Sequence, residues 1–166
     1  MKVYVGTYNK YNCGSIGGKW LNLADYKNAS EFYTKCGELH KNEIDPEFMF
    51  QDSENVPESL IGESFIDDRV FDILNLNLNP EEQTAFIEFL DSQSFYWEDI
   101  GLGYDAFQEL FMGNFDKLQD YTDQEFDDLY LHEIPEHLTY VIDYDAYYHT
   151  AKYDYWISKT GNVFHN

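Results

Sequence analysis

The chain has 166 residues and a formal net charge of −22 at pH 7, yet 43% of its residues are hydrophobic and 19% are aromatic. This composition excludes a disordered polyanion, because acidic disordered segments are poor in aromatic residues. No apolar run approaches the ~20 residues of a membrane helix, and two cysteines do not make a disulfide framework.

The first 23 residues predict two strands and the loop between them. Residues 2–8 alternate between apolar and polar side chains as a strand does, and residues 19–23 are a candidate partner strand. Residues 9–18 are rich in Gly and Asn, which is typical of a long hairpin loop. Because a strand rather than a signal peptide opens the sequence, we expect a cytoplasmic protein.

One short helix and a third strand complete the predicted N-terminal unit. Ser30 is a candidate cap for a helix through Cys36, and Gly37 is a candidate stop. Residues 48–51 have the apolar and aromatic composition of a strand. These elements predict an α+β domain over residues 1–60.

The middle of the chain, residues 61–103, predicts an acidic helical domain. Its first helix is indicated by apolar residues at helical spacing, namely Ile66, Val70, Phe71 and Leu74. A strong helix start follows at residues 79–82, where an Asn cap precedes a Pro and two acids. The side of this second helix that we expect to be buried carries Ala85, Phe86, Phe89 and Leu90.

The last part, residues 104–166, predicts an α+β domain that ends in a hairpin. Helices are expected over residues 105–112, from the capping-box sequence that begins at Thr122, and from Pro135. The terminal hairpin is expected over residues 153–165. Leu138, Val141 and Ile142 lie on one side of the helix expected from Pro135.

The distribution of charge is the strongest functional signal. Residues 43–166 hold 29 Asp and Glu against four Lys and Arg, whereas residues 1–42 hold three acids and six lysines. Ordinary soluble domains intersperse both signs, because unpaired like charge destabilises the compact state. Glu–Lys pairs one turn apart would also stabilise the helices. A chain that forgoes such pairing is predicted to meet a strongly basic partner, and neither nucleic acid nor anionic membrane.

Helical carboxylates at this density resemble the phosphates of duplex DNA. B-form DNA carries one negative charge per ~1.7 Å, so the excess of 25 acids in residues 43–166 matches roughly 40 Å of duplex. A compact globule of this length has a radius of gyration of only ~15 Å, which favours an elongated α+β chain of small domains. The carboxylates expected to form this DNA-mimic surface are Asp67, Asp68, Asp72, Glu81, Glu82, Glu88, Asp91, Glu98, Asp99, Asp105, Glu109, Asp116, Asp120, Asp123, Glu125, Asp127 and Asp128.

Both ends of the chain carry a resemblance to a known family. At the N-terminal end the matching residues are Val3-Tyr4-Val5, Tyr11-Asn12, Gly14, Gly18, Trp20, Leu23, Phe50-Gln51-Asp52 and Glu54. At the C-terminal end they are Ile134-Pro135, Leu138, Ile142-Asp143-Tyr144, Ala146-Tyr147, Gly161, Val163 and Phe164. With these residues, its length and its acidity, the chain resembles the ArdA antirestriction family of DNA-mimic proteins, which inhibit Type I restriction-modification enzymes. It departs from the family at Tyr148-His149, where Gly-Arg is expected.

The resemblance implies three small domains in a row and a curved acidic homodimer that occupies the DNA groove of the methyltransferase core. It also implies an origin on a mobile genetic element and a dimer contact in the C-terminal domain. Aromatic residues there suit an interface, and they suit a domain core equally well. The candidate interface residues are Tyr144, Tyr147, Tyr148, Tyr153, Tyr155 and Trp156.

Motifs for catalysis or metal binding are incomplete. A zincin helix would need a histidine four residues after His132, where Glu136 stands. Residues 101–106 imitate a dinucleotide fingerprint, but Asp105 would face the pyrophosphate, so a loop before a helix is expected there. The chain has no nucleophile elbow, and neither cysteine has a convincing neighbouring base. We therefore expect no catalytic residue, no metal and no cofactor.

Two other classes of function stay open. An acidic binding module or chaperone for another basic protein would have the same charge distribution. A carboxylate-based hydrolase is also conceivable, although with 32 acids a suitable pair carries no signal. Inhibition of a restriction enzyme by a non-enzymatic DNA mimic is the leading hypothesis.

Overall fold

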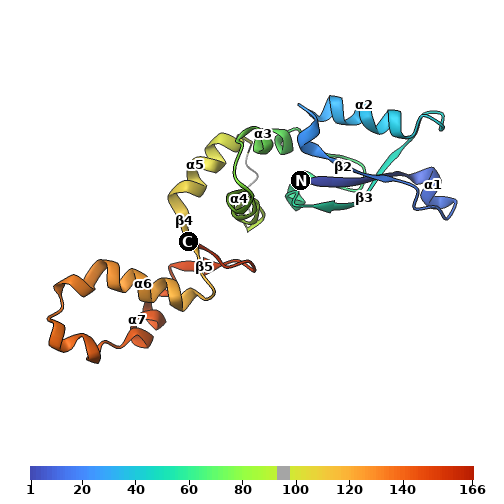
Figure 1. The fold of residues 1–166 in the computed structure, drawn as a ribbon. Coiled ribbons are helices and arrows are strands. Elements are labelled where there is room, and N and C mark those ends of the chain that lie inside the picture. Colours follow the sequence, from blue (N-terminus) through green and yellow to red (C-terminus); the bar gives the residue numbers. More distant parts are fainter. Residues whose placement is uncertain (93–97) are drawn as a thin grey trace. The chain divides into compact units, whose positions relative to one another are not determined.

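The computed structural model describes residues 1–92 and 98–166, which form two compact units, Met1–Tyr104 and Asp105–Asn166 (Figure 1). Each unit combines helices with a small antiparallel sheet of three strands, which confirms the predicted α+β class. The finer division into three domains stays a prediction. Among the described residues, no helix is long and apolar enough to cross a membrane.

The sheet of the first unit has the strand order β2-β1-β3. The strands are β1 (Lys2–Thr7), β2 (Lys19–Asn22) and β3 (Phe48–Glu54), which confirms all three predicted strands. Strand β1 is central because it pairs antiparallel with both neighbours, and its Val3 and Val5 are buried.

The connection between β1 and β2 is not simply the long loop that its composition predicts. It begins with a short helix, α1 (Tyr8–Asn12), which Thr7 caps by accepting a hydrogen bond from the Lys10 backbone N–H at 3.3 Å. The remaining Gly-rich residues include Gly14 at φ +76°, a left-handed conformation that favours glycine. The Gly- and Asn-rich composition therefore predicts the turn correctly, but it does not predict helix α1.

Helix α2 (Ala29–Leu39) begins earlier and ends later than predicted. Asn28, rather than Ser30, is the cap, since its side chain accepts from the Glu31 N–H at 3.0 Å. The helix continues through Gly37 because its apolar side packs on the sheet, with the Phe32 and Phe50 rings 5.6 Å apart.

The first unit also contains three shorter elements. The 3-10 helix η1 (Leu23–Asp25) connects β2 to α2, and the 3-10 helix η2 (Glu58–Leu60) and the helix α3 (Arg69–Asn75) follow β3. The apolar spacing predicts Ile66 on the same helix as Val70, but Ile66 instead forms an isolated bridge with Ile61 before α3 begins.

Helix α4 (Pro80–Ser92) confirms its sequence signature. The Asn79 side chain accepts hydrogen bonds from the N–H groups of Glu81 and Glu82 at 3.1 and 2.9 Å, as an N-cap does. The residues predicted to be buried are buried, namely Ala85, Phe86, Phe89 and Leu90.

Helix α5 (Ile100–Leu110) overturns the prediction of a loop at residues 101–103. Asp99 caps the helix by accepting from the N–H groups of Gly101 and Leu102 at 2.8 and 3.2 Å, so both glycines of this segment lie in the helix. The helix ends before Met112 because β4 (Phe111–Asn114) follows at once.

The sheet of the second unit has the order β4-β6-β5 and contains the predicted terminal hairpin. Its last two strands are β5 (Tyr155–Ile157) and β6 (Asn162–His165). Phe164 is fully buried, stacks on Trp156 at 4.3 Å and lies 5.4 Å from Phe111. Phe107 of α5 stacks on Phe111 at 5.0 Å, which completes an aromatic core.

Helix α6 (Leu118–Tyr130) starts four residues before the predicted capping box. Asp120 accepts from the Lys117 backbone N–H at 3.1 Å, whereas Thr122 is buried inside the helix and donates to the Gln119 carbonyl at 3.0 Å. The Thr-x-x-Glu pattern therefore marks the interior of a helix here. Helix α7 (Tyr144–Ala151) follows later, capped by Asp143.

Between α6 and α7 the chain forms the 3-10 helices η3 (Leu131–Glu133) and η4 (Glu136–Val141). Pro135 thus precedes a 3-10 helix rather than the predicted α-helix. Of the three apolar residues predicted on one side of that helix, Leu138 and Val141 are exposed and Ile142 is partly exposed.

Candidate interaction surface

The predicted DNA-mimic carboxylates lie on α3 to α6 and on the segments that flank them. On α4, Glu81 is exposed while Phe86 and Phe89 are fully enclosed, as an amphipathic helix requires. None of the predicted carboxylates is fully buried. The exposed ones are Asp68, Asp72, Glu81, Asp91, Glu98, Asp99, Asp105, Glu109, Asp116, Asp120 and Asp128.

Some of these carboxylates also stabilise the fold through hydrogen bonds to the backbone. Asp99 and Asp120 accept backbone hydrogen bonds at the starts of α5 and α6, where a negative charge also meets the positive end of the helix dipole. Asp68 accepts from the Ala29 N–H at 3.2 Å, and Asp91 from the Glu58 N–H at 3.0 Å. They fix backbone segments without requiring a cation.

Asp67 differs from these carboxylates because a cation neutralises it. The Arg69 guanidinium donates two hydrogen bonds to it, at 2.8 and 2.7 Å. This bidentate pair makes Asp67 a poor member of the predicted surface.

A further group of carboxylates is free to meet a partner. These side chains are exposed and make no hydrogen bond or ion pair with any part of the chain that the structure describes. We define them as the free carboxylates: Asp72, Glu81, Glu98, Asp105, Glu109, Asp116 and Asp128. A basic partner could bind them without breaking an internal contact.

The second unit turns other predicted carboxylates toward tyrosine hydroxyls. Glu125 accepts from Tyr147 at 3.0 Å, from Tyr121 at 3.4 Å and from Tyr155. These four side chains, together with the hydrogen-bonded pair Tyr144 and Asp127 (2.5 Å), are called the tyrosine–carboxylate cluster below. The cluster ties α6 to α7 and β5.

The electrostatics of the cluster follow from burial and from its uncompensated charge. Burial raises the pKa of Tyr147 and of Tyr155, and the hydrogen bonds to Glu125 raise them further. Both hydroxyls therefore stay protonated and keep donating to Glu125. The first unit has a smaller counterpart, in which Tyr104 donates to Glu82 at 2.5 Å.

Asp123 lies beside the cluster in a less favourable position. Its Oδ1 atom is inaccessible to solvent and has no hydrogen-bond partner among the described residues. Burial raises the pKa of this carboxyl, and the charges of Asp120, Asp145 and Asp127 raise it further. Asp123 thus adds negative charge at a cost in stability.

The residues predicted for a dimer interface lie in different surroundings. Tyr144, Tyr147 and Tyr155 belong to the tyrosine–carboxylate cluster, and Trp156 stacks on Phe164. Tyr148 and Tyr153 flank the Lys152 ammonium, 5.6 and 5.2 Å from their ring centroids. Of the six predicted residues, Tyr153 alone is exposed. The interface itself stays a prediction.

A polar cluster of the first unit was missed in the sequence because its members are far apart along the chain. The Glu43 carboxylate accepts from Thr7 at 3.0 Å and from Asn9 at 3.3 Å, and it pairs with Lys10 at 3.1 Å. Burial opposes ionisation of Glu43, but the bonds from Lys10, Thr7 and Asn9 outweigh it, and the pKa is lowered. The Lys10 ammonium also lies 2.7 Å from Nδ1 of the buried His40.

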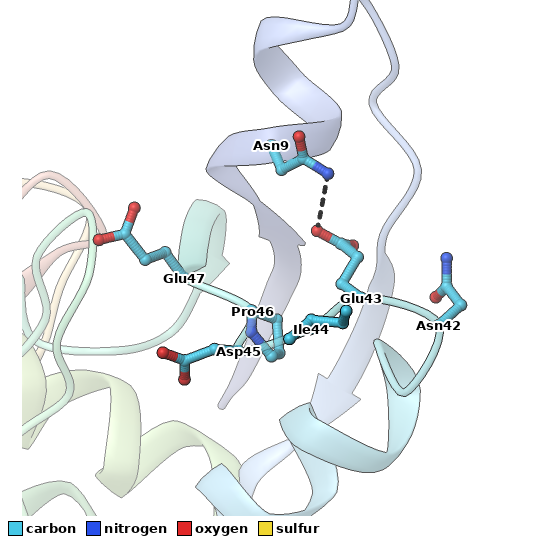
Figure 2. A pocket seen from close by; sticks show the side chains of 7 residues that line it. All are labelled: Asn9, Asn42, Glu43, Ile44, Asp45, Pro46 and Glu47. Atoms are coloured by element: carbon cyan, nitrogen blue, oxygen red, sulfur yellow. Dashed lines mark hydrogen bonds between the residues drawn. The ribbon is translucent and has the colours of Figure 1, made fainter.

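Two hollows of the first unit also contain carboxylates. The first, of about 550 Å³, is lined by residues 42–47 and Asn9, and Figure 2 shows Glu43 bound to Asn9 while Asp45 and Glu47 point away from them. The second, of about 390 Å³, is lined by Asp72, Glu98 and Asp99 among others. Within the described residues, no three His, Cys, Asp or Glu side chains are placed to hold a metal ion.

Comparison with known proteins adds the identity of the fold. The family model described as antirestriction protein (ArdA) matches residues 3–165, which is nearly the whole chain. No curated protein matches this chain. The match spans both units, with the free carboxylates and the tyrosine–carboxylate cluster inside it. The chain therefore belongs to the ArdA family of antirestriction proteins.

Proposed function

We propose that this protein inhibits Type I restriction-modification enzymes by occupying the DNA-binding site of their methyltransferase core as a mimic of duplex DNA. The family membership supports antirestriction activity. The observation that carries the mimicry is the set of free carboxylates, which lie between residues 72 and 128, where Lys117 is the one Lys or Arg of the sequence.

The physical argument starts from how proteins hold DNA. Lys and Arg contacts to phosphates position a protein on the duplex and supply much of the affinity, but they carry no sequence information. Carboxylates can therefore replace phosphates without any copy of the base edges. Because α3, α4, α5 and α6 hold the free carboxylates or lie next to them, little order has to be gained on binding.

The remaining carboxylates, which cap helices or accept hydrogen bonds from tyrosine hydroxyls, contribute through the electrostatic field of the whole protein. The summed potential raises the rate at which a basic cleft finds the protein. We further propose that the protein acts as a homodimer through its second unit, with Tyr153 as the exposed candidate contact.

The decisive test is binding to a purified Type I methyltransferase core in the presence of increasing unlabelled duplex. We expect DNA to displace the protein and the affinity to fall steeply as NaCl rises. Binding that duplex leaves unchanged would overturn the mimicry. A binding module for another basic protein would share the salt dependence but leave the restriction enzyme active.

Variants of the free carboxylates sharpen this test. The triple substitution Glu81→Gln, Asp105→Asn and Glu109→Gln should lower the affinity and reduce the slope of log Kd against log [NaCl]. Substitution of the neighbouring exposed amide Gln108→Asn is the matched control and should change neither quantity. If single neutralisations abolished binding, a distributed electrostatic surface would be the wrong description.

A further inference from the structure

The side chain of His40 is buried between two partners that fix its protonation state. Its Nε2 atom lies 3.2 Å from the Val5 carbonyl oxygen, which can only accept a hydrogen bond, so Nε2 carries the proton. Its Nδ1 atom lies 2.7 Å from the Lys10 ammonium, which can only donate, so Nδ1 carries the lone pair. The two contacts therefore select one neutral tautomer of His40.

The neighbours of this ring come from every element packed against it. Helix α1 contributes Lys10, and the turn that follows α2 contributes Glu43, whose Oε1 atom lies 3.8 Å from Nδ1 of His40. Strand β1 contributes the carbonyl described above, and β3 contributes the Phe48 ring, 6.2 Å away between centroids. On α2 itself, burial raises the pKa of the Cys36 thiol to about 12, so that group brings no charge. Lys10 and Glu43 are therefore the charges that act on His40.

A second proton on His40 conflicts with the position of Lys10. Protonation of Nδ1 would turn its new N–H toward the ammonium 2.7 Å away, so that two donors and two positive charges would meet. Burial, the largest cause, and the charge of Lys10 lower the pKa of His40, while the Val5 carbonyl and Glu43 act in the opposite direction. The Lys10 side chain is 24% exposed and flexible, so its ammonium can withdraw into solvent.

Glu43 is placed to receive the protonated ring. Its backbone N–H donates to the His40 carbonyl at 2.9 Å, which keeps the two side chains in one turn. Closing the distance of 3.8 Å to Nδ1 needs a side-chain shift of about 1 Å and no change in the backbone. The C-terminal end of α2, where His40 is the cap residue, also favours a positive charge. The carboxylate can therefore keep one cation in either protonation state of His40.

We propose that Lys10 and His40 are alternative cationic partners of Glu43, and that acidification transfers the carboxylate from Lys10 to His40. At neutral pH the Lys10 ammonium ties α1 to the end of α2. In the acidic form this tie is released, and weaker contacts such as the hydrogen bond from Asn9 to Glu43 at 3.3 Å remain (Figure 2). Helix α1 and the loop after it therefore loosen while the sheet stays folded. This switch belongs to the first unit and does not depend on the proposed function.

The first test is an NMR titration of the imidazole nitrogens in the full chain. The ¹⁵N shifts of His40 should show the Nε2–H tautomer at neutral pH and protonation of Nδ1 below about pH 6.5. Lys10→Met should raise the pKa of His40 by about one unit because a repelling charge is lost, whereas Glu43→Gln should lower it by a similar amount. Lys27→Met, which removes an exposed charge of the same sign elsewhere in the first unit, is the matched control and should leave the pKa of His40 unchanged.

The second test asks by hydrogen exchange whether the transfer loosens α1. The N–H groups of Cys13, Gly14 and Ser15 bind carbonyls of α1 at 3.1, 2.9 and 2.9 Å. Their protection factors should fall roughly tenfold when the pH is taken from about 7.5 to about 5.5, and those of β1 and β3 much less. The pKa of Glu43 is lowered, so its carboxylate stays ionised over this range. His40→Gln, which cannot be protonated, should abolish the pH dependence.

The direction of the stability change is fixed by the same residues. Because the native pKa of His40 is lowered, the unfolded chain binds the proton more readily, so the first unit loses stability as pH falls from about 6.5 to that native pKa. Three results would overturn the proposal. They are a His40 ring that stays neutral down to about pH 5, shifts of its pKa in the same direction in Lys10→Met and Glu43→Gln, and an equal loss of protection throughout the first unit. The titrations of Lys10→Met and Glu43→Gln decide the case even if His40→Gln does not fold.

Discussion

Each unit encloses much of one glutamate side chain, but the two units stabilise its carboxylate with different partners. In the first unit, Lys10 pairs with Glu43, so the enclosed charge is cancelled. In the second unit, Glu125 is held by three tyrosine hydroxyls, which are neutral donors. Hydrogen bonds from hydroxyls satisfy the carboxylate and leave its charge in place. The second unit therefore folds around carboxylates without giving up the negative field that its proposed function needs.

The largest expected effect comes from removing the acceptor of the tyrosine–carboxylate cluster. Glu125→Ala leaves three tyrosine hydroxyls without their acceptor and should destabilise the second unit by roughly 3 kcal/mol. Hydrogen exchange of the full chain should show faster exchange in α6, α7 and β5 and little change in β1 to β3. The control Asp128→Ala, at an exposed position of the same helix, should change exchange little. Equal loss of protection in both variants would mean that the cluster does not hold the unit.

The corresponding change in the first unit should be smaller. Lys10→Met leaves Glu43 with only neutral donors, which makes it resemble Glu125, and the expected cost is about 1–2 kcal/mol. Thermal unfolding and hydrogen exchange around α1 and residues 40–47 measure it. Lys27→Met, at an exposed lysine whose ammonium has no ion pair with the described residues, is the control. If the stability of the first unit did not change, hydroxyl and amide donors alone would be sufficient to hold Glu43.

A stabilising substitution is expected at Asp123. Asp123→Asn removes a negative charge that burial and the neighbouring carboxylates disfavour, and it should raise stability at pH 7 by about 1 kcal/mol. Because the native pKa of Asp123 is raised, the native state gains stability as pH falls from neutrality through that pKa. The advantage of the Asn variant should therefore shrink on acidification, as melting curves across pH would show. If the Asn variant were more stable by the same amount at every pH, the effect would come from packing rather than from charge.

The smallest effect is the response to salt. With a net charge of −22, raising NaCl from about 20 to 300 mM shortens the Debye length from ~20 to ~6 Å and should raise the melting temperature. Hydrogen exchange should show the larger gain in the second unit, because its enclosed carboxylates have no cation. A melting temperature that does not change with NaCl would mean that the carboxylates are too far apart to repel one another strongly.

Local signals predicted much of the fold. The strands of both sheets, except β4, and the start of α4 at Asn79 followed from alternation and capping. Strand β4 was missed because residues 111 and 112 were assigned to the end of the preceding helix. Failures occurred where two local signals competed: Asn28 outcompetes Ser30 as a cap, and the cap at the start of α6 lies before Thr122. The Pro135 segment was predicted as a helix from its apolar spacing, but it forms the 3-10 helix η4, in which Leu138 and Val141 are exposed.

The candidate site was predicted in composition but not in arrangement. The acids and the aromatic residues were both identified, but they were assigned to separate surfaces. Tyr155 and Glu125 are 30 residues apart, and no local pattern indicates that one donates to the other. Pairings of this kind are set by how α6, α7 and β5 pack, which a single sequence does not encode locally.

The tyrosine–carboxylate cluster has a consequence for how such a chain can evolve. Since folding of the second unit uses hydroxyl donors, the exposed carboxylates are under no demand to keep a cationic partner. Asp and Glu can exchange, or shift along a helix, provided the total charge is kept. We expect sequences of this kind to drift quickly over their surface while Glu125 and its tyrosines change only together.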